Sequence, residues 1–181
     1  MDVTETDMDA VVVEFYAPLY RFALSLAGSV APASDLTQET FYRWLQHGTE
    51  LRDPSKVKGW LFTTLYREFL RGNRRTLRFP HHELEEVESE LPVVGPADVG
   101  HLDGRLVMQA LAQVDENYRA PLSLFYLESF SYSEIAEALE IPIGTVMSRL
   151  SRGRVELRRH LAALLSEEDR KVIPFFQAKA R

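Results

Sequence analysis

The sequence predicts an all-α protein of two small helical domains joined by an acidic flexible linker, the C-terminal domain containing a helix-turn-helix. Apolar residues recur at helical spacing on both sides of residues 79–103, whereas that segment is rich in proline and acid. Residues 131–161 have the pattern of two helices around a short turn. We therefore expect domains at 1–78 and 104–165, and a tail of unknown role at 166–181.

The composition is that of a soluble globular protein, with 181 residues, 45% hydrophobic and 27% charged. The absence of cysteine excludes disulfides and thiolate metal sites. No uninterrupted apolar run approaches the ~20 residues that span a bilayer. The acidic N-terminus also lacks signal-peptide character. We expect a cytoplasmic protein without membrane insertion.

The net charge of −6 conceals two basic stretches separated by an acidic one. Residues 80–103 hold seven acidic side chains and no Lys or Arg, which leaves 20 acidic residues elsewhere against all 21 basic ones. Residues 52–78 hold eight basic against two acidic side chains, and residues 144–160 hold five arginines against one glutamate. Because a polyanion responds to regional charge, nucleic acid is a candidate partner.

Two helices are predicted at the start of the chain. Residues 8–30 have apolar positions at helical spacing, with Gly28 as a C-cap, and Pro32 and Ser34 open a second helix that runs to Gln46. The packing side of this second helix holds Thr37, Thr40, Phe41, Trp44 and Leu45. Its other side holds Asp35, Gln38, Glu39, Tyr42 and Gln46. That polar face is either solvated surface or a docking surface for a partner.

A third helix is predicted from about residue 55 to residue 75, after a loop. Its core side holds Val57, Trp60, Leu61, Thr64 and Leu65. A second stripe of Phe62, Tyr66 and Phe69 is followed by Arg71, Arg74 and Arg75. Such a mixture suits single-stranded nucleic acid, because bases stack on rings while arginines contact phosphates. The alternative is burial in a helical bundle; we expect burial for Phe62 and Phe69, and phosphate contacts for the arginines.

Residues 104–128 return to helical spacing with a break at 115–116, and the helix-turn-helix follows. Ser131 and Glu134 have the spacing of a capping box, and Pro142 ends the first helix and suits the start of the second. On the second helix one face gathers Val146, Leu150, Gly153, Leu157 and Leu161. The opposite face gathers Ser148, Ser151, Arg152, Val155 and Arg159, with Arg149 and Arg154 on the flanks. Short hydroxyls and arginines suit a helix in the DNA major groove; the alternative is an ordinary amphipathic helix with a solvated basic face.

No catalytic constellation is visible. The five histidines lack the spacing of a zinc site, and no phosphate-binding glycine loop or G-x-S-x-G motif occurs. We expect a protein that is not an enzyme and has no metal, cofactor or small-molecule substrate.

Three segments together resemble the bacterial RNA polymerase sigma factors of the extracytoplasmic-function (ECF) type. DLTQETFYRWLQ (residues 35–46) is similar to that family's core-polymerase-binding helix, and KGWLFTTLYREFLRGNRR (58–75) to its promoter-melting and minus-ten segment. YSEIAEALEIPIGTVMSRLSRGR (132–154) is similar to its minus-thirty-five reader. The resemblance covers about residues 10–163, and it implies a protein that binds core polymerase, recognises two promoter elements and helps melt the duplex.

The resemblance also implies roles for individual residues. It assigns polymerase contacts to Asp35, Gln38, Glu39 and Tyr42. It assigns minus-ten DNA to Lys58, Trp60, Tyr66, Arg67, Arg71, Arg74 and Arg75. It assigns base edges of the minus-thirty-five element to Met147, Ser148, Ser151 and Arg152, and phosphates and the helix start to Thr145, Arg149 and Arg154. The linker would thread the RNA exit path, where its acids imitate RNA.

The chain departs from the family pattern at three positions. Arg67 stands where the family usually has asparagine, Arg71 where it usually has aspartate, and Met147 where a basic residue is common. The first two concern minus-ten preference and melting, and the third concerns the minus-thirty-five element. Members of this family are commonly held by an anti-sigma factor. The candidate partners are therefore core polymerase, duplex and melted promoter DNA, and an anti-sigma factor.

Two other classes of function fit parts of the pattern. A stand-alone helix-turn-helix regulator with an N-terminal helical domain would leave the basic aromatic segment 58–75 without purpose. A helical adaptor that binds only protein would not need arginines at 149, 152 and 154. Binding to core polymerase, and transcription from a two-part promoter, separate the sigma factor from both.

Overall fold

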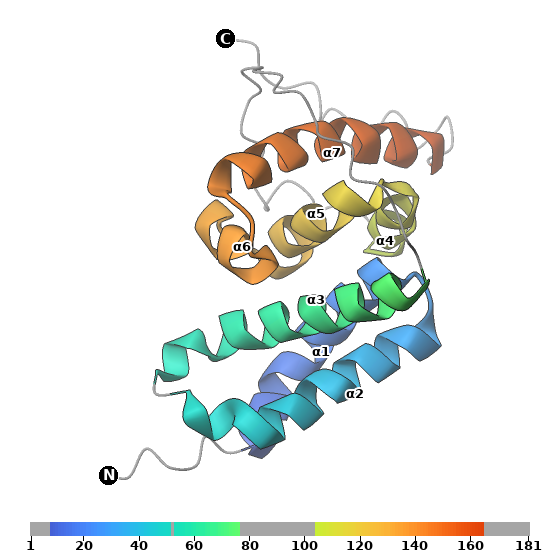
Figure 1. Ribbon diagram of the computed structural model, residues 1–181. Coiled ribbons are helices and arrows are strands. Elements are labelled where there is room, and N and C mark those ends of the chain that lie inside the picture. Colours follow the sequence, from blue (N-terminus) through green and yellow to red (C-terminus); the bar gives the residue numbers. More distant parts are fainter. Residues whose placement is uncertain (1–7, 52, 77–103, 165–181) are drawn as a thin grey trace.

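Figure 1 shows the computed structural model of the protein, which describes residues 8–51, 53–76 and 104–164. These residues form seven α-helices and two 3₁₀ turns, and they contain no strand. The N-terminal elements are α1 (Met8–Ala27), α2 (Val30–His47), η1 (Gly48–Glu50), η2 (Pro54–Lys56) and α3 (Val57–Thr76). The C-terminal elements are α4 (Gly104–Gln113), α5 (Glu116–Glu128), α6 (Tyr132–Leu139) and α7 (Ile143–Leu164). The all-α prediction is confirmed, whereas the predicted linker and tail, 79–103 and 166–181, lie outside the described residues.

The helix boundaries follow local signals in the sequence. Gly28, at φ +70°, ends α1, and its N–H donates to the Leu24 carbonyl at 2.9 Å. The predicted capping box of α6 is present, with the Ser131 hydroxyl and the Glu134 carboxylate each accepting the other residue's backbone N–H. Helix α2 begins at Val30, earlier than the expected opening at Pro32 and Ser34. Pro32 therefore sits in the first turn, where its missing N–H has no intrahelical acceptor to lose.

The three N-terminal helices pack around a core of aromatic and aliphatic side chains. Phe62 is 0% and Phe69 7% exposed, which confirms the burial predicted for them. Trp44 meets Trp60 edge to face at 5.3 Å between ring centroids. Leu45 was expected on the packing side of α2, but it is 60% exposed. It lies about 90° from the centre of that face at 100° per residue, so it falls on the rim.

The four C-terminal helices bury the predicted apolar face of α7. Every member of that face is buried: Val146, Leu150, Gly153, Leu157 and Leu161. Gly153 allows α7 to approach α5 closely, because a Cβ at this position would lie 2.8 Å from side-chain atoms of both Tyr118 and Leu122. Helix α7 packs on α4, α5 and α6, and it forms the outermost layer of this half (Figure 1).

The two halves also pack against each other. Helix α1 contacts α5, and α3 contacts α6, so α3 lies between its own bundle and the C-terminal helices (Figure 1). The aromatic core crosses the boundary: Phe62 lies 5.5 Å from Phe22 and 4.9 Å from Phe130, centroid to centroid. Phe130 is 2% exposed. The hydrophobic core of the described residues is therefore continuous between the halves.

Among the described residues, α1 is long and apolar enough to pass as a membrane span by length and composition alone. Its side chains Leu19, Phe22, Ala23 and Leu26 are buried in the core. A core helix of a globular protein passes the same test, so this feature is weak evidence for a membrane.

Candidate nucleic-acid interface

The outer face of α7 begins with short side chains that are open to solvent. Ser148 is exposed and Ser151 and Thr145 are half-buried, while Met147 is 54% exposed. The Ser148 hydroxyl donates to the Thr145 carbonyl at 3.1 Å, so it lies against the helix and adds little height to the surface. The predicted base-facing positions 147, 148 and 151 are thus together on one accessible surface at the start of α7.

The arginines of α7 are in different environments. Arg154 donates to the Tyr132 hydroxyl at 2.9 Å, and its guanidinium lies 5.2 Å from the centre of the Phe125 ring. Arg149 lies on the other flank, close enough to Tyr66 of α3 for its charge to oppose in part the rise that burial causes in the pKa of that hydroxyl. Arg152 is half-buried and has interactions within the protein. In this arrangement Arg149 and Arg154 therefore lie beside neighbouring helices, away from the centre of the outer face.

Helix α3 directs much of its predicted minus-ten set toward the C-terminal half. Lys58 donates to the Glu128 carbonyl oxygen at 3.2 Å, and its ammonium lies 4.2 Å from the Phe130 ring centroid. Arg67 donates to the Glu140 carboxylate through Nε at 2.9 Å and through Nη2. Burial raises the pKa of the half-buried Tyr66 hydroxyl. Trp60 is half-buried, and the side chains of Arg74 and Arg75 lie outside the described residues.

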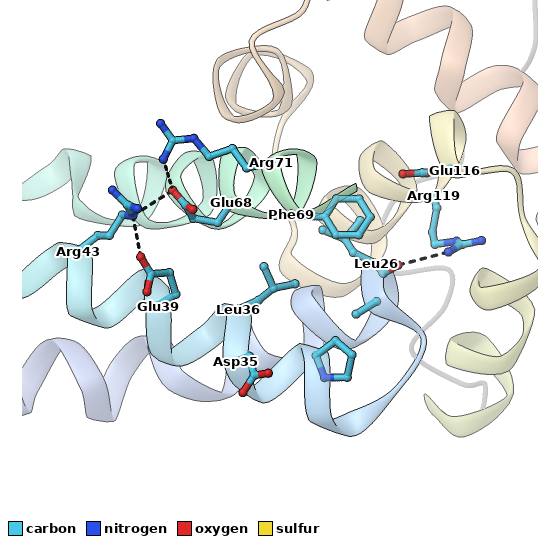
Figure 2. Close-up of a pocket in the computed structure, with 13 residues that line it drawn as sticks. Leu26, Asp35, Leu36, Glu39, Arg43, Glu68, Phe69, Arg71, Glu116 and Arg119 are labelled. Atoms are coloured by element: carbon cyan, nitrogen blue, oxygen red, sulfur yellow. Dashed lines mark hydrogen bonds and ion pairs between the residues drawn. The ribbon is translucent and has the colours of Figure 1, made fainter. Parts of the chain in front are cut away.

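The polar face of α2 is accessible, as the sequence predicted. Asp35 and Gln38 are exposed and Tyr42 is 55% exposed. Glu39 bonds to Arg43 at 3.0 Å, Arg43 reaches Glu68 of α3 at 3.0 Å, and Arg71 joins the same carboxylate at 3.0 Å. Figure 2 shows this chain of ion pairs along one wall of an open groove of about 1090 Å³. Asp35, Glu39 and Arg71 all line the groove, and Arg71 is already paired there with Glu68.

The contact between the halves contains an ion pair between a buried glutamate and a half-exposed arginine, which the sequence patterns did not predict. Glu128, whose side chain is 4% exposed, accepts two bonds from Arg21 of α1, at 3.1 Å from Nε and 3.0 Å from Nη2. Burial raises the pKa of the Glu128 carboxyl, and the bonds from Arg21 oppose this rise. The available signal was a single glutamate at the end of the largely apolar segment from Pro121 to Leu127. A charge in such a run is almost never fully buried without a partner.

Comparison with known proteins assigns both halves to one class, the sigma-70 factors. The family model described as Sigma-70 region 2 matches residues 11–79, and Sigma-70, region 4 matches residues 104–157. The ECF RNA polymerase sigma factor SigL of Mycobacterium tuberculosis is 36% identical over 160 residues, which are 87% of this chain and 90% of SigL. SigE of Mycolicibacterium smegmatis is 35% identical over 164 residues, 88% of this chain but 63% of SigE, so the chain spans less than two thirds of that relative.

A solved structure has the same fold. It is the sigma factor RpoE in complex with the anti-sigma factor NepR from Bartonella quintana, with a TM-score of 0.67, 24% identity and coverage of 88% of this chain and 99% of that chain. The chain belongs to the ECF family of RNA polymerase sigma factors. It directs promoter-specific transcription initiation, and its partners are core RNA polymerase and promoter DNA. Sigma factors are initiation factors and are not themselves enzymes.

Proposed function

We propose that this sigma factor divides its work among three surfaces: α2 binds core polymerase, α3 engages the minus-ten element and its melted strand, and α7 reads the minus-thirty-five element. The N-terminal domain would comprise residues 1–78 and the C-terminal domain residues 104–165. The observation that carries the proposal is the outer face of α7, where Met147, Ser148 and Ser151 are accessible while the opposite face is buried. A recognition helix contacts base edges through such a surface near its N-terminus.

The assignment of α3 rests on charge and accessibility. Arg67 and Arg71 are exposed on this helix. The Arg67–Glu140 pair is exposed on both sides, whereas Arg71 pairs with Glu68, whose side chain is only 14% exposed. An exposed ion pair contributes only about 0.2–1 kcal/mol, so a phosphate can replace Glu140 as the partner of Arg67 without a large cost. Glu68 would keep Arg43 as its partner if Arg71 turned to a phosphate. Trp60, Tyr66 and Lys58, with Arg74 and Arg75, complete the proposed minus-ten set.

The assignment of α2 rests on its accessible polar face of Asp35, Gln38, Glu39 and Tyr42. In the part of the chain that the structure describes, the side chains of Asp35 and Gln38 make no hydrogen bond or ion pair, so a partner can bind both without displacing a contact. The protein would act in the cytoplasm, where core polymerase and DNA are found, and without enzymatic activity of its own. An anti-sigma factor, and a role for the acidic linker in the RNA exit path, stay predictions.

Competition for core polymerase tests the assignment of α2. We expect the double variant Asp35→Ala/Gln38→Ala to lose at least about fivefold in affinity, because an interface anchor is worth more than about 1 kcal/mol. Glu14→Ala removes an exposed acid from α1 and serves as the matched control. Transcription from a two-part promoter at limiting core polymerase should fall in the same ratio. Equal affinity of the double variant and the control would refute this surface.

Binding of duplex promoter DNA without polymerase tests the alternative of a stand-alone regulator. A sigma factor with this division of surfaces needs core polymerase for tight and specific binding, whereas a regulator binds its site unaided. We expect no specific shift of promoter DNA by the free protein at concentrations at which the holoenzyme binds fully.

A further inference from the structure

The beginning of α7 has an apolar feature that the proposed reading of bases does not use. Three of the large hydrophobic side chains that are exposed in the described residues lie on this one helix: Ile143 at 51%, Met147 at 54% and Val155 at 59%. Ile143 and Met147 are four residues apart, so they are neighbours on the helix surface. Both lie in the first two turns, the part of a recognition helix that approaches base edges.

Met147 projects beyond its small neighbours on the surface of α7. Its neighbours at i−3, i+1 and i+4 are Gly144, Ser148 and Ser151, all of them small. A Cβ built at Gly144 would meet nothing within 4 Å, so the space beside Met147 is open. Helical side chains point toward the helix N-terminus, which directs Met147 over this space and toward Ile143. The tip of the side chain is therefore at the end of α7 that enters the groove.

The chemistry of this tip selects one kind of base edge. Methionine has no hydrogen-bond donor, and its sulfur is only a weak acceptor, so it gains little from the polar edges of guanine, adenine or cytosine. Thymine alone among the four bases presents a methyl group in the major groove. A flexible unbranched side chain adapts well to such a small apolar target.

We propose that Met147, with Ile143 beside it, contacts the C5-methyl group of a thymine in the minus-thirty-five element and makes that position specific for thymine. The inference rests on the proposed role of α7 and adds the base that the helix selects. Burial of one methyl group is worth about 0.8 kcal/mol, which corresponds to about a fourfold change in affinity.

The test uses the full chain assembled with core polymerase. Promoters are first selected with this holoenzyme from a library whose minus-thirty-five element is randomised. Each thymine of the selected element is then replaced singly by deoxyuridine, which lacks only the methyl group, and holoenzyme affinity is measured. At one thymine we expect about a fourfold loss with the unaltered chain. The variant Met147→Ala should show that loss already on thymine and no further loss on deoxyuridine.

Two further variants sharpen the result. Val155→Ala is the matched control, because it truncates an exposed apolar side chain of the same helix about two turns further along. It should retain the full sensitivity to deoxyuridine. Met147→Lys should shift the selected base at that position from thymine toward guanine, whose two acceptors suit a lysine. Met147 is exposed, so these variants should fold normally.

Several results would overturn the inference: a selected element without thymine, indifference to deoxyuridine at every position, or equal sensitivity in the unaltered chain and Met147→Ala. Failure of the proposed role of α7 looks different, because the selection would then yield no preferred minus-thirty-five element at all. In that case both the proposed role of α7 and the thymine contact of Met147 would be wrong.

Discussion

The two basic helices that face DNA in our proposal, α7 and α3, are in opposite situations. The outer face of α7 is uncovered, with Met147, Ser148 and Ser151 accessible as the molecule stands. Helix α3 lies under the C-terminal half (Figure 1). Its Lys58 lies against Phe130, and its Arg67 is bonded to Glu140. In our proposal, the surface of α7 is therefore accessible in this arrangement, whereas Lys58 and Arg67 of α3 must first lose their contacts to the C-terminal half before they can bind DNA.

Truncation of Phe130, which helps to cover α3, should have the largest effect on stability. Phe130→Ala removes a buried ring that packs on Phe62 across the boundary, and we expect a loss of about 3–5 kcal/mol in the free energy of unfolding. Phe125→Ala is the control, because the ring contacts of that residue, to Tyr126, Tyr132 and Arg154, all lie within the C-terminal half. Urea unfolding measures both losses.

Hydrogen exchange then separates the two variants. Phe130→Ala should raise the exchange rate of the amides of α3, because that helix loses its cover, and Phe125→Ala should leave them protected. Equal exchange in α3 for both variants would show that Phe130 supports only its own half.

Arg152→Ala tests the accessible outer face of α7, and we expect an effect of intermediate size. If the guanidinium bonds a guanine, its loss costs about 1–3 kcal/mol at one base pair of the minus-thirty-five element and relaxes the preference there. Holoenzyme affinity for promoters with each single substitution gives the measurement. A uniform loss over all sequences would instead identify a phosphate contact.

Glu140→Gln should have the smallest effect. The Arg67–Glu140 pair is exposed on both sides, so we expect a loss of about 0.2–1 kcal/mol in unfolding free energy at neutral pH and low salt. The Arg67 side-chain bond lowers the pKa of the Glu140 carboxyl. Its contribution is therefore present above the unfolded-state pKa and disappears as pH falls through the lowered folded-state pKa.

Urea unfolding between neutral pH and about pH 3 measures that dependence. The difference between the unaltered chain and Glu140→Gln should become smaller toward the acid end. Glu137→Gln, three residues earlier and also exposed, is the control and should follow the unaltered chain at every pH. A difference that persists at low pH would mean that the ion pair is not its cause.

The sequence predicted well those features that are encoded within one helix. The buried face of α7, the capping box at Ser131, the burial of Phe62 and the open polar face of α2 all follow from helical period and capping chemistry. The prediction for Leu45 was wrong because this residue lies at the edge of the packing face of α2. At such an edge, a rotation of one side chain changes its burial without changing the helix. Local patterns are therefore sufficient for each element and for which of its sides is apolar.

Contacts between distant elements could not be predicted in the same way. Arg21 and Glu128 are 107 residues apart, and Arg67 and Glu140 are 73 apart, so neither helical period nor spacing relates them. Both pairs depend on how the two halves dock. Docking depends on the shapes of two completed surfaces, which the spacing of residues along each helix does not encode.

Glu140 is notable for its backbone as well as its charge. It ends α6 in the left-handed region, at φ +55°, a conformation that costs an ordinary residue about 1–2 kcal/mol and that glycine adopts freely. The exposed ion pair with Arg67 stabilises the folded state by no more than about 1 kcal/mol. The turn would thus be at least as stable with glycine, so stability alone does not account for the glutamate. What it adds is a contact from the proposed minus-thirty-five reader to the other basic helix, and this contact is weak enough to break at little cost when the two helices separate.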